Sequence, residues 1–210
     1  MKSIRISVIA IAAVLTSLVL TAAAFAQESG SRGFDVAVLG GIHALNKNDT
    51  ALPDHLLSVP AVLNVAYPLT ENFSVEGDFT WLIPVQTSVD MGSGTKEDRK
   101  APDVLSYQAG LRIAPPSTTW TPYVAAGAGA MTFLSNTDAD RLPVLDKSET
   151  MFALNFGGGA QFGLSGPWAV RADFREFVAF PSKDADGFSD NGTADPIWME
   201  RGTLGIAYRY

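Results

Sequence analysis

Residues 198–210, Trp-Met-Glu-Arg-Gly-Thr-Leu-Gly-Ile-Ala-Tyr-Arg-Tyr, decide the fold of this chain. From the last residue back to Leu204, every second residue is apolar or aromatic, and the residues between them are small or polar. The apolar positions are Leu204, Ile206, Tyr208 and Tyr210. A period of two predicts a β-strand with one apolar face. Such a strand would promote aggregation at an open sheet edge, so we expect it to pair with the first strand of the mature chain and close a barrel.

The N-terminal residues predict a secretory signal peptide. Lys2 and Arg5 precede an apolar run over residues 6–20, and a small-x-small motif ends at Ala26. A basic start, an apolar middle and a small-residue end are typical of a leader that is cut after Ala26. An uncleaved N-terminal anchor is the alternative. The expected boundaries are therefore a signal peptide, residues 1–26, and a mature domain, residues 27–210.

Composition restricts the class of protein further. Removal of 26 of the 210 residues leaves 184, which is enough for one domain. The mature chain has 13 basic and 22 acidic residues, a formal charge of −9, which argues against nucleic acid as a partner. The absence of cysteine excludes a disulfide scaffold. No later stretch approaches the length of an apolar membrane helix, so a mature chain embedded in a membrane would have to be a barrel.

Eight alternating segments predict an all-β, eight-stranded antiparallel up-and-down transmembrane barrel. They cover residues 34–43, 57–67, 73–83, 103–113, 120–134, 150–164, 168–180 and 198–210. Short turns alternate strictly with four long loops, a pattern typical of membrane barrels with short periplasmic turns and long outer loops. The facing of residues 120–134 is ambiguous, because that segment is rich in Gly and Ala. Pro60 lacks an N–H group, so a bulge or a late start of pairing is expected there.

Aromatic residues gather near both ends of the predicted strands. The group toward the short turns is Phe34, Tyr67, Phe73, Trp120, Tyr123, Phe162, Trp168, Tyr208 and Tyr210. The group toward the long loops is Trp81, Phe133, Phe152, Phe180 and Trp198. Two aromatic bands around an aliphatic middle are typical of membrane-interface girdles. A soluble, lipocalin-like barrel is the alternative, but the polar faces carry few charges and many small residues, which suit a narrow lumen better than a solvent surface.

Several motifs resemble the small outer-membrane β-barrel family, which includes OmpX and the membrane domain of OmpA. They are Trp-Thr-Pro-Tyr-Val-Ala-Ala-Gly-Ala-Gly-Ala at 120–130, Asn-Phe-Gly-Gly-Gly-Ala at 155–160, Trp-Ala-Val-Arg-Ala-Asp-Phe-Arg at 168–175, and the aromatic C-terminus. The resemblance covers the chain from about Gly33 and implies that the mature domain, residues 27–210, is an outer-membrane β-barrel. It implies a bacterial (Gram-negative) outer membrane, contact with its lipid and lipopolysaccharide, and insertion by the barrel-assembly machinery. Leu204, Ile206, Tyr208 and Tyr210 would form the assembly-signal strand, although that family most often ends in Phe.

The lumen face of the predicted barrel carries nine ionisable side chains. They are Asp35, Glu76, Asp78, Arg112, Arg171, Asp173, Arg175, Arg201 and Arg209. Eight strands enclose an interior that side chains just fill, and an unpaired buried charge is costly. We therefore expect a plug of ion pairs that includes Glu76–Arg112 and Asp35–Arg209, with Asp173 balancing Arg171 or Arg175. A gate, in which rearranged pairs open a narrow water path, is the alternative.

The sequence offers no recognisable catalytic set. Its two histidines, His43 and His55, have no suitably placed serine, and we interpret them as solvated histidines at the outer rim. No cofactor or metal site is expected. The predicted function is a non-enzymatic structural or surface-interaction role, in which the long loops bind an extracellular ligand that the sequence does not identify. A narrow porin-like pore is the alternative, and an outer-leaflet lipid hydrolase is a more distant one.

Overall fold

The computed structural model describes residues 33–46, 57–85, 87–90, 96–116, 119–136, 145–182, 188 and 195–210, with the backbone alone at residues 46, 87–90 and 96–99. Ten strands lie within these ranges. They are β1 (Asp35–Asn46), β2 (Leu57–Pro68), β3 (Phe73–Pro84), β4 (Thr87–Asp90), β5 (Lys96–Arg99), β6 (Val104–Ile113), β7 (Trp120–Phe133), β8 (Glu149–Gly163), β9 (Trp168–Phe180) and β10 (Ile197–Arg209).

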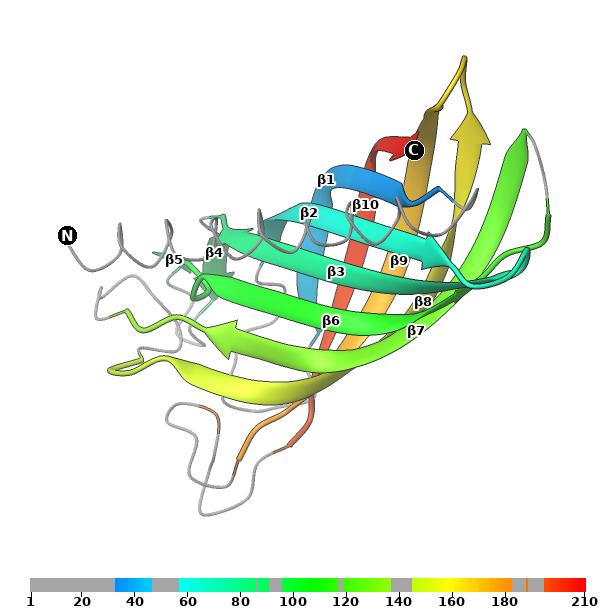
Figure 1. Cartoon of the computed structure of the whole chain (residues 1–210). Coiled ribbons are helices and arrows are strands. Elements are labelled where there is room, and N and C mark those ends of the chain that lie inside the picture. The colour runs from blue at the N-terminus through cyan, green and yellow to red at the C-terminus, as the bar shows by residue number, and fades with distance from the viewer. Residues whose placement is uncertain are drawn as a thin grey trace, which may run out of the picture.

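Eight of these strands form a closed antiparallel barrel in the order β1-β10-β9-β8-β7-β6-β3-β2 (Figure 1). The closing seam pairs β1 with β10, from Asp35 opposite Arg209 to Asn46 opposite Trp198. The amide of Tyr210 also donates to the carbonyl of Phe34 at 2.9 Å, and the two rings stack with centroids 5.2 Å apart. The prediction that the last strand pairs with the first is confirmed. Closure of the barrel pairs the backbone groups of the last strand, which would be an exposed edge in an open sheet.

Two local features differ from the sequence-based expectations. Residues 84–102 were expected to be a loop, but they contain the separate two-stranded sheet β4–β5 at the long-loop end (Figure 1). At Pro60 the β1–β2 ladder is interrupted between Gly40–Ala61 and His43–Ser58, and the register is the same on both sides of the gap. The proline therefore removes pairing without inserting a bulge, because it lacks the N–H group that the ladder needs.

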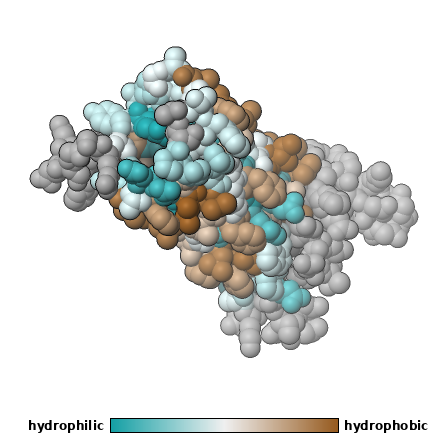
Figure 2. Space-filling model, turned by 90° about the vertical axis from the view of Figure 1, so that its right-hand side faces the viewer, coloured by the Kyte–Doolittle hydropathy of each residue, from teal (hydrophilic) through white to brown (hydrophobic). Residues whose placement is uncertain are grey.

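The apolar faces of the strands point outward and the polar faces point into the lumen. Exposed apolar side chains include Val38, Ile42 and Leu204 at 64%, 65% and 61% exposure, and brown apolar patches cover much of the visible wall in Figure 2. This arrangement excludes the soluble, lipocalin-like alternative, which needs the reverse facing. The ambiguous strand β7 turns Tyr123, Ala125, Met131 and Phe133 inward.

The residues assigned to the aromatic girdles face outward except at two positions. Trp120, Phe162 and Trp168 lie on the outer surface near the short turns. Tyr123 and Phe133, which were assigned to the girdles, are 5% and 3% exposed and face the lumen. The error follows from the unresolved facing of β7, since both residues belong to its inward set.

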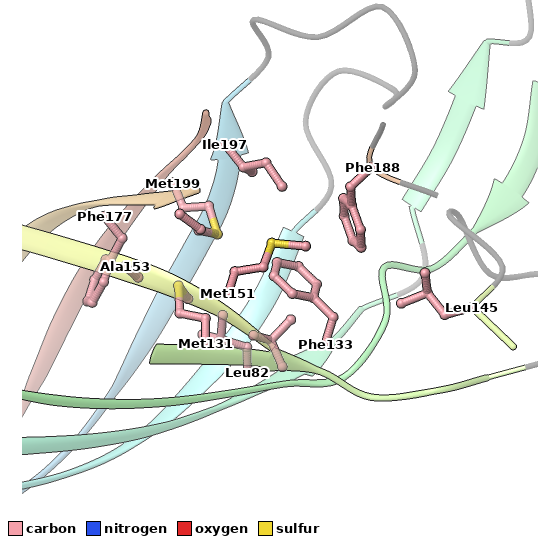
Figure 3. Packing of buried hydrophobic residues seen from close by; sticks show 12 residues of the cluster. Leu82, Met131, Phe133, Leu145, Met151, Ala153, Phe177, Phe188, Ile197 and Met199 are labelled. Atoms are coloured by element: carbon pink, nitrogen blue, oxygen red, sulfur yellow. The ribbon is translucent and has the colours of Figure 1, made fainter. Parts of the chain in front are cut away.

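The long-loop half of the lumen is filled by an apolar cluster (Figure 3). Its members are Leu82, Val104, Met131, Phe133, Leu145, Met151, Ala153, Phe177, Phe188, Ala179, Ile197 and Met199. Leu145 and Phe188 lie outside the barrel strands, and the Phe188 ring packs against Phe133 with centroids 4.8 Å apart. Described residues from the long connections therefore cover this end of the interior. Among the described residues, no helix is long and apolar enough to span a membrane.

Candidate functional site in the barrel lumen

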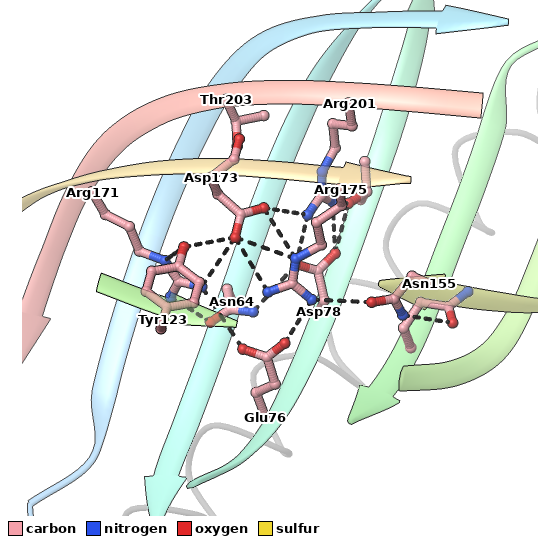
Figure 4. Close-up of polar contacts among 12 residues, drawn as sticks. Asn64, Glu76, Asp78, Tyr123, Asn155, Arg171, Asp173, Arg175, Arg201 and Thr203 are labelled. Carbon is pink, nitrogen blue, oxygen red and sulfur yellow. Dashed lines mark hydrogen bonds and ion pairs between the residues drawn. The ribbon is translucent and has the colours of Figure 1, made fainter. Parts of the chain in front are cut away.

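The middle of the lumen holds a charged layer that is built around β9. Because strand side chains alternate in direction, Arg171, Asp173 and Arg175 all point inward from this strand (Figure 4). Arg201 joins them from the neighbouring β10, and Glu76 and Asp78 reach in from β3. The layer contains three arginines and three carboxylates, so its formal charges balance. Each of the six side chains is at most 4% exposed.

Asp173 is the centre of this layer. Its carboxylate lies 3.0 Å from Arg175 Nε, 3.2 Å from Arg201 Nη2 and 3.5 Å from Arg171 Nη2. It also accepts a hydrogen bond from the Tyr123 hydroxyl at 2.7 Å. One carboxylate thus contacts three guanidinium groups, and these contacts offset the cost of burying the charges.

The two β3 carboxylates complete the charge balance from across the lumen. Glu76 Oε1 lies 2.6 Å from Arg175 Nη1, and Glu76 Oε2 lies 3.7 Å from Arg171 Nη2. Asp78 accepts two hydrogen bonds from Arg201, from Nη1 to Oδ1 at 2.7 Å and from Nη2 to Oδ2 at 3.1 Å. This parallel two-point geometry is the strong form of an arginine–carboxylate contact. The ion pairs therefore tie β3 to β9 and β10 across the interior.

Neutral polar side chains connect the charges into one network. Arg171 Nε donates to the Tyr123 hydroxyl at 2.8 Å, and its guanidinium lies 4.8 Å from the centre of the Tyr123 ring. Arg171 Nη1 donates to Asn64 Oδ1 at 2.8 Å, and Arg175 Nη1 donates to Asn155 Oδ1 at 3.2 Å. The lumen residues predicted from the sequence did not include Asn64 and Asn155. Both lie on the inward faces of their strands. Neither has a charged residue two positions away on its own strand, so no sequence signal pointed to these contacts.

A glycine makes room for the tyrosine in this network. Gly159 lies opposite Tyr123 in the β7–β8 ladder. A Cβ atom on Gly159 would fall 2.4 Å from the Tyr123 hydroxyl oxygen and close to the carbonyl oxygen of Ala172. A side chain at this position would therefore displace the ring that bridges Arg171 and Asp173.

Eight of the nine predicted lumen residues are buried, and Arg209 is the exception. Its side chain is 61% exposed at the short-turn rim, with Nη2 4.0 Å from Asp35 Oδ2. The expected Glu76–Arg112 ion pair is not formed, because Glu76 turns to Arg175 and Arg171. Arg112 lies opposite Ser74, two pairs closer to the short turns than Glu76. It stacks over Tyr123 at 5.4 Å and remains outside the central layer.

The expectation of solvated rim histidines is wrong for His43. This side chain is 4% exposed and faces the lumen, opposite Arg201 in the β1–β10 ladder. Within the described part of the chain neither of its ring nitrogens has a hydrogen-bond partner, so no described residue positions it as a general base. His55 lies outside the described residues. Among the residues that the structure describes, no group of three or more metal-binding side chains comes together.

The charged layer and the apolar cluster close successive levels of the interior. The two levels meet at Arg201, whose guanidinium lies 5.0 Å from the centre of the Phe177 ring. A closed eight-stranded antiparallel barrel with an apolar outer surface and a charged layer across its lumen is a transmembrane β-barrel. The chain belongs to the outer membrane protein β-barrel domain family, whose profile matches residues 12–208.

Solved structures share this fold at low sequence identity. The N-terminal β-barrel domain of Pseudomonas aeruginosa OprF is 14% identical, with a TM-score of 0.50, and the match covers 87% of this chain and 100% of that chain. Neisserial surface protein A (NspA) is 12% identical, with a TM-score of 0.55, and the match covers 84% of this chain and 97% of that chain. A search of curated protein sequences finds no match. At these identities the likeness concerns the fold alone.

Proposed function

We propose that this protein is a non-conducting outer-membrane barrel with a structural or surface-interaction role in the bacterial envelope. Its lumen would be plugged by the ion-pair layer, and its long loops would present the interacting surface. The observation that carries the proposal is the balanced layer of three arginines and three carboxylates across the lumen, with each side chain at most 4% exposed. A filled interior leaves the surface as the place where function can reside.

The apolar cluster supports the plug independently of the charges. Phe133, Met131 and Met199 are at most 3% exposed in the lumen on the long-loop side of the charged layer. Leu145 and Phe188 pack with them. A solute crossing the barrel would have to break the ion pairs and also displace this packed apolar level. Both steps cost free energy, because buried charges lose their partners and well-packed side chains lose their contacts.

Planar-bilayer conductance tests the plug directly. The purified protein should give no steady, sizeable openings over the range of voltages that the bilayer withstands. Steady openings from pure protein would contradict the proposal and favour the alternative, a narrow pore for small solutes. A cavity at the short-turn end, lined by Arg112 and Tyr123 among others, is the observation that favours such a pore.

The enzymatic alternative depends on the histidines. A lipid hydrolase would need a positioned histidine at the membrane surface, whereas His43 is buried and has no hydrogen-bond partner among the residues that the structure describes. Replacement of His43 or His55 by alanine should leave the lipids of the outer leaflet unchanged. A lost lipid modification in either variant would instead support the hydrolase.

We further propose the route and partners that the sequence implies. The leader would be cut after Ala26, and the C-terminal strand would be read by the barrel-assembly machinery. Outer-membrane lipid and lipopolysaccharide would contact the apolar wall, and an extracellular or envelope component would bind the loops. Mass spectrometry of the mature protein tests the cleavage site, and a pull-down against envelope and host components tests the loop partner.

A further inference from the structure

A cavity of about 330 Å³ lies in the barrel on the short-turn side of the charged layer. It is bordered by the first residues of β1 and β7, the last residues of β6, and the turn after β2, with Arg112, Asp35, Gln161 and Tyr123 among its lining side chains. We call this cavity the short-turn vestibule. Its volume falls within the range of small-molecule sites in proteins. On the side toward the charged layer, Tyr123 and Arg171 belong to the network that fills the lumen, so the vestibule is a blind pocket.

Two buried groups of opposite charge in the vestibule each have one atom without a partner among the described residues, although Oδ2 of Asp35 also lies 4.0 Å from Arg209. Arg112 is 8% exposed, and among the described residues it makes no ion pair and its buried Nη1 has no hydrogen-bond partner. Asp35 is 5% exposed, and although its Oδ2 accepts a bond from Gln161 at 3.0 Å, its buried Oδ1 has no partner. A buried polar group without a partner costs free energy, and the cost is larger for charged groups. The pocket therefore presents a donor and an acceptor that a ligand can satisfy.

The surrounding charges specify the chemistry of that ligand. Arg209 and Glu71 at the rim of the vestibule add one charge of each sign. The lining therefore has no net charge that would favour a simple anion or a simple cation. A solute that carries both a carboxylate and a donor matches Arg112 and Asp35 together. An arginine can also bind a carboxylate through two parallel hydrogen bonds, which fixes the orientation of the solute.

We propose that the short-turn vestibule binds a small zwitterionic solute, with its carboxylate on Arg112 and its ammonium group on Asp35. In the outer-membrane orientation this pocket faces the periplasm. The solute enters and leaves from that side, so binding requires no passage through the lumen. This site is separate from the surface role proposed for the loops, and a conducting lumen would not remove it.

Calorimetric titration of the folded protein in detergent micelles tests the site. Glycine, β-alanine and 4-aminobutyrate serve as probes, because they separate the two charged groups by increasing distances. At least one of the three should bind saturably. The matched acid and the matched amine, each lacking one charged group, should bind about tenfold more weakly or worse, since a lost hydrogen bond to a charged group changes an equilibrium by that order.

Variants assign the two contacts. Arg112→Gln and Asp35→Asn should each weaken binding of the best probe about tenfold or more. Arg112→Lys keeps the charge but loses the paired N–H groups, so it should also bind more weakly. Lys147→Gln is the matched control for loss of a positive charge, because this side chain is 64% exposed and lies near the start of β8, at the other end of the barrel. It should bind as the wild type does.

Folding is checked in every variant by the shift in electrophoretic mobility that a closed barrel shows before heating. If Arg112→Gln does not fold, Arg112→Lys and Asp35→Asn decide the question. The proposal is wrong if none of the three probes binds saturably, or if folded Arg112 variants bind as the wild type does. Equal affinity for the probe and its matched acid would exclude the contact with Asp35 and overturn the two-point site.

Discussion

Loss of the carboxylate at position 173 is the sharpest perturbation of the lumen. Asp173→Asn keeps the shape of the side chain but leaves three arginines facing only two carboxylates in the charged layer. The change removes the negative partner of contacts at 3.0, 3.2 and 3.5 Å to Arg175, Arg201 and Arg171. The amide nitrogen also places donors against guanidinium donors. Breaking a buried pair by removing one partner costs about 3–5 kcal/mol, so the free energy of unfolding should fall by that amount.

A second substitution restores the balance of charge. Arg171→Met removes an arginine whose loss leaves two good pairs, since Glu76 keeps Arg175 at 2.6 Å and Asp78 keeps Arg201 at 2.7 Å. The double variant Asp173→Asn/Arg171→Met should therefore be less destabilised than the sum of the two single variants. The expected coupling is about 1–3 kcal/mol, the upper part of the range for residues in one network.

Urea-induced unfolding in micelles, followed by tryptophan fluorescence, gives the free energies. Lys147→Gln is the control, because Lys147 is 64% exposed where it pairs with Glu149 at 3.4 Å, and its loss should cost no more than about 1 kcal/mol. The reasoning fails if Asp173→Asn costs as little as this control. It fails equally if the effects of Asp173→Asn and Arg171→Met add without coupling.

Three further outcomes are expected. Gly159→Ala should lower the free energy of unfolding by about 1–3 kcal/mol, because its Cβ would overlap the Tyr123 hydroxyl; a variant with unchanged stability in urea would contradict the tight fit. Phe133→Ala should cost about 3–5 kcal/mol in the same assay, because the ring is 3% exposed inside the apolar cluster; a loss of under 1 kcal/mol would mean that the loop end of the lumen is not packed. A single cysteine at Ser135, beyond the long-loop end of β7, should react with an impermeant maleimide on intact cells, whereas one at Ser165, in a short turn, should not; labelling of the latter alone would mean that the barrel is inverted.

The architecture could be read from the sequence because it depends on local patterns. In a strand the side-chain direction repeats every two residues, so the parity of Arg171, Asp173 and Arg175 places all three on one face without knowledge of any neighbour. The alternation of short turns and long loops then gives strand order and direction. Strand β7 was the exception, because its glycines and alanines give no contrast between its faces, and Tyr123 and Phe133 were misplaced as a result.

Only the tertiary structure decided which charges meet. Asp78 and Arg201 are 123 residues apart and come from β3 and β10, strands that are not neighbours in the barrel, yet they share two hydrogen bonds across the lumen. The sequence suggested partners on adjacent strands, such as Glu76 with Arg112, because adjacency is all that strand order provides. In a narrow closed barrel, the curvature and stagger of the wall bring opposite sides within side-chain reach. The sequence alone therefore determined that the lumen is charged, and closure of the barrel determined that Asp173 joins its arginines and that Arg112 lies without an ion pair beside the vestibule.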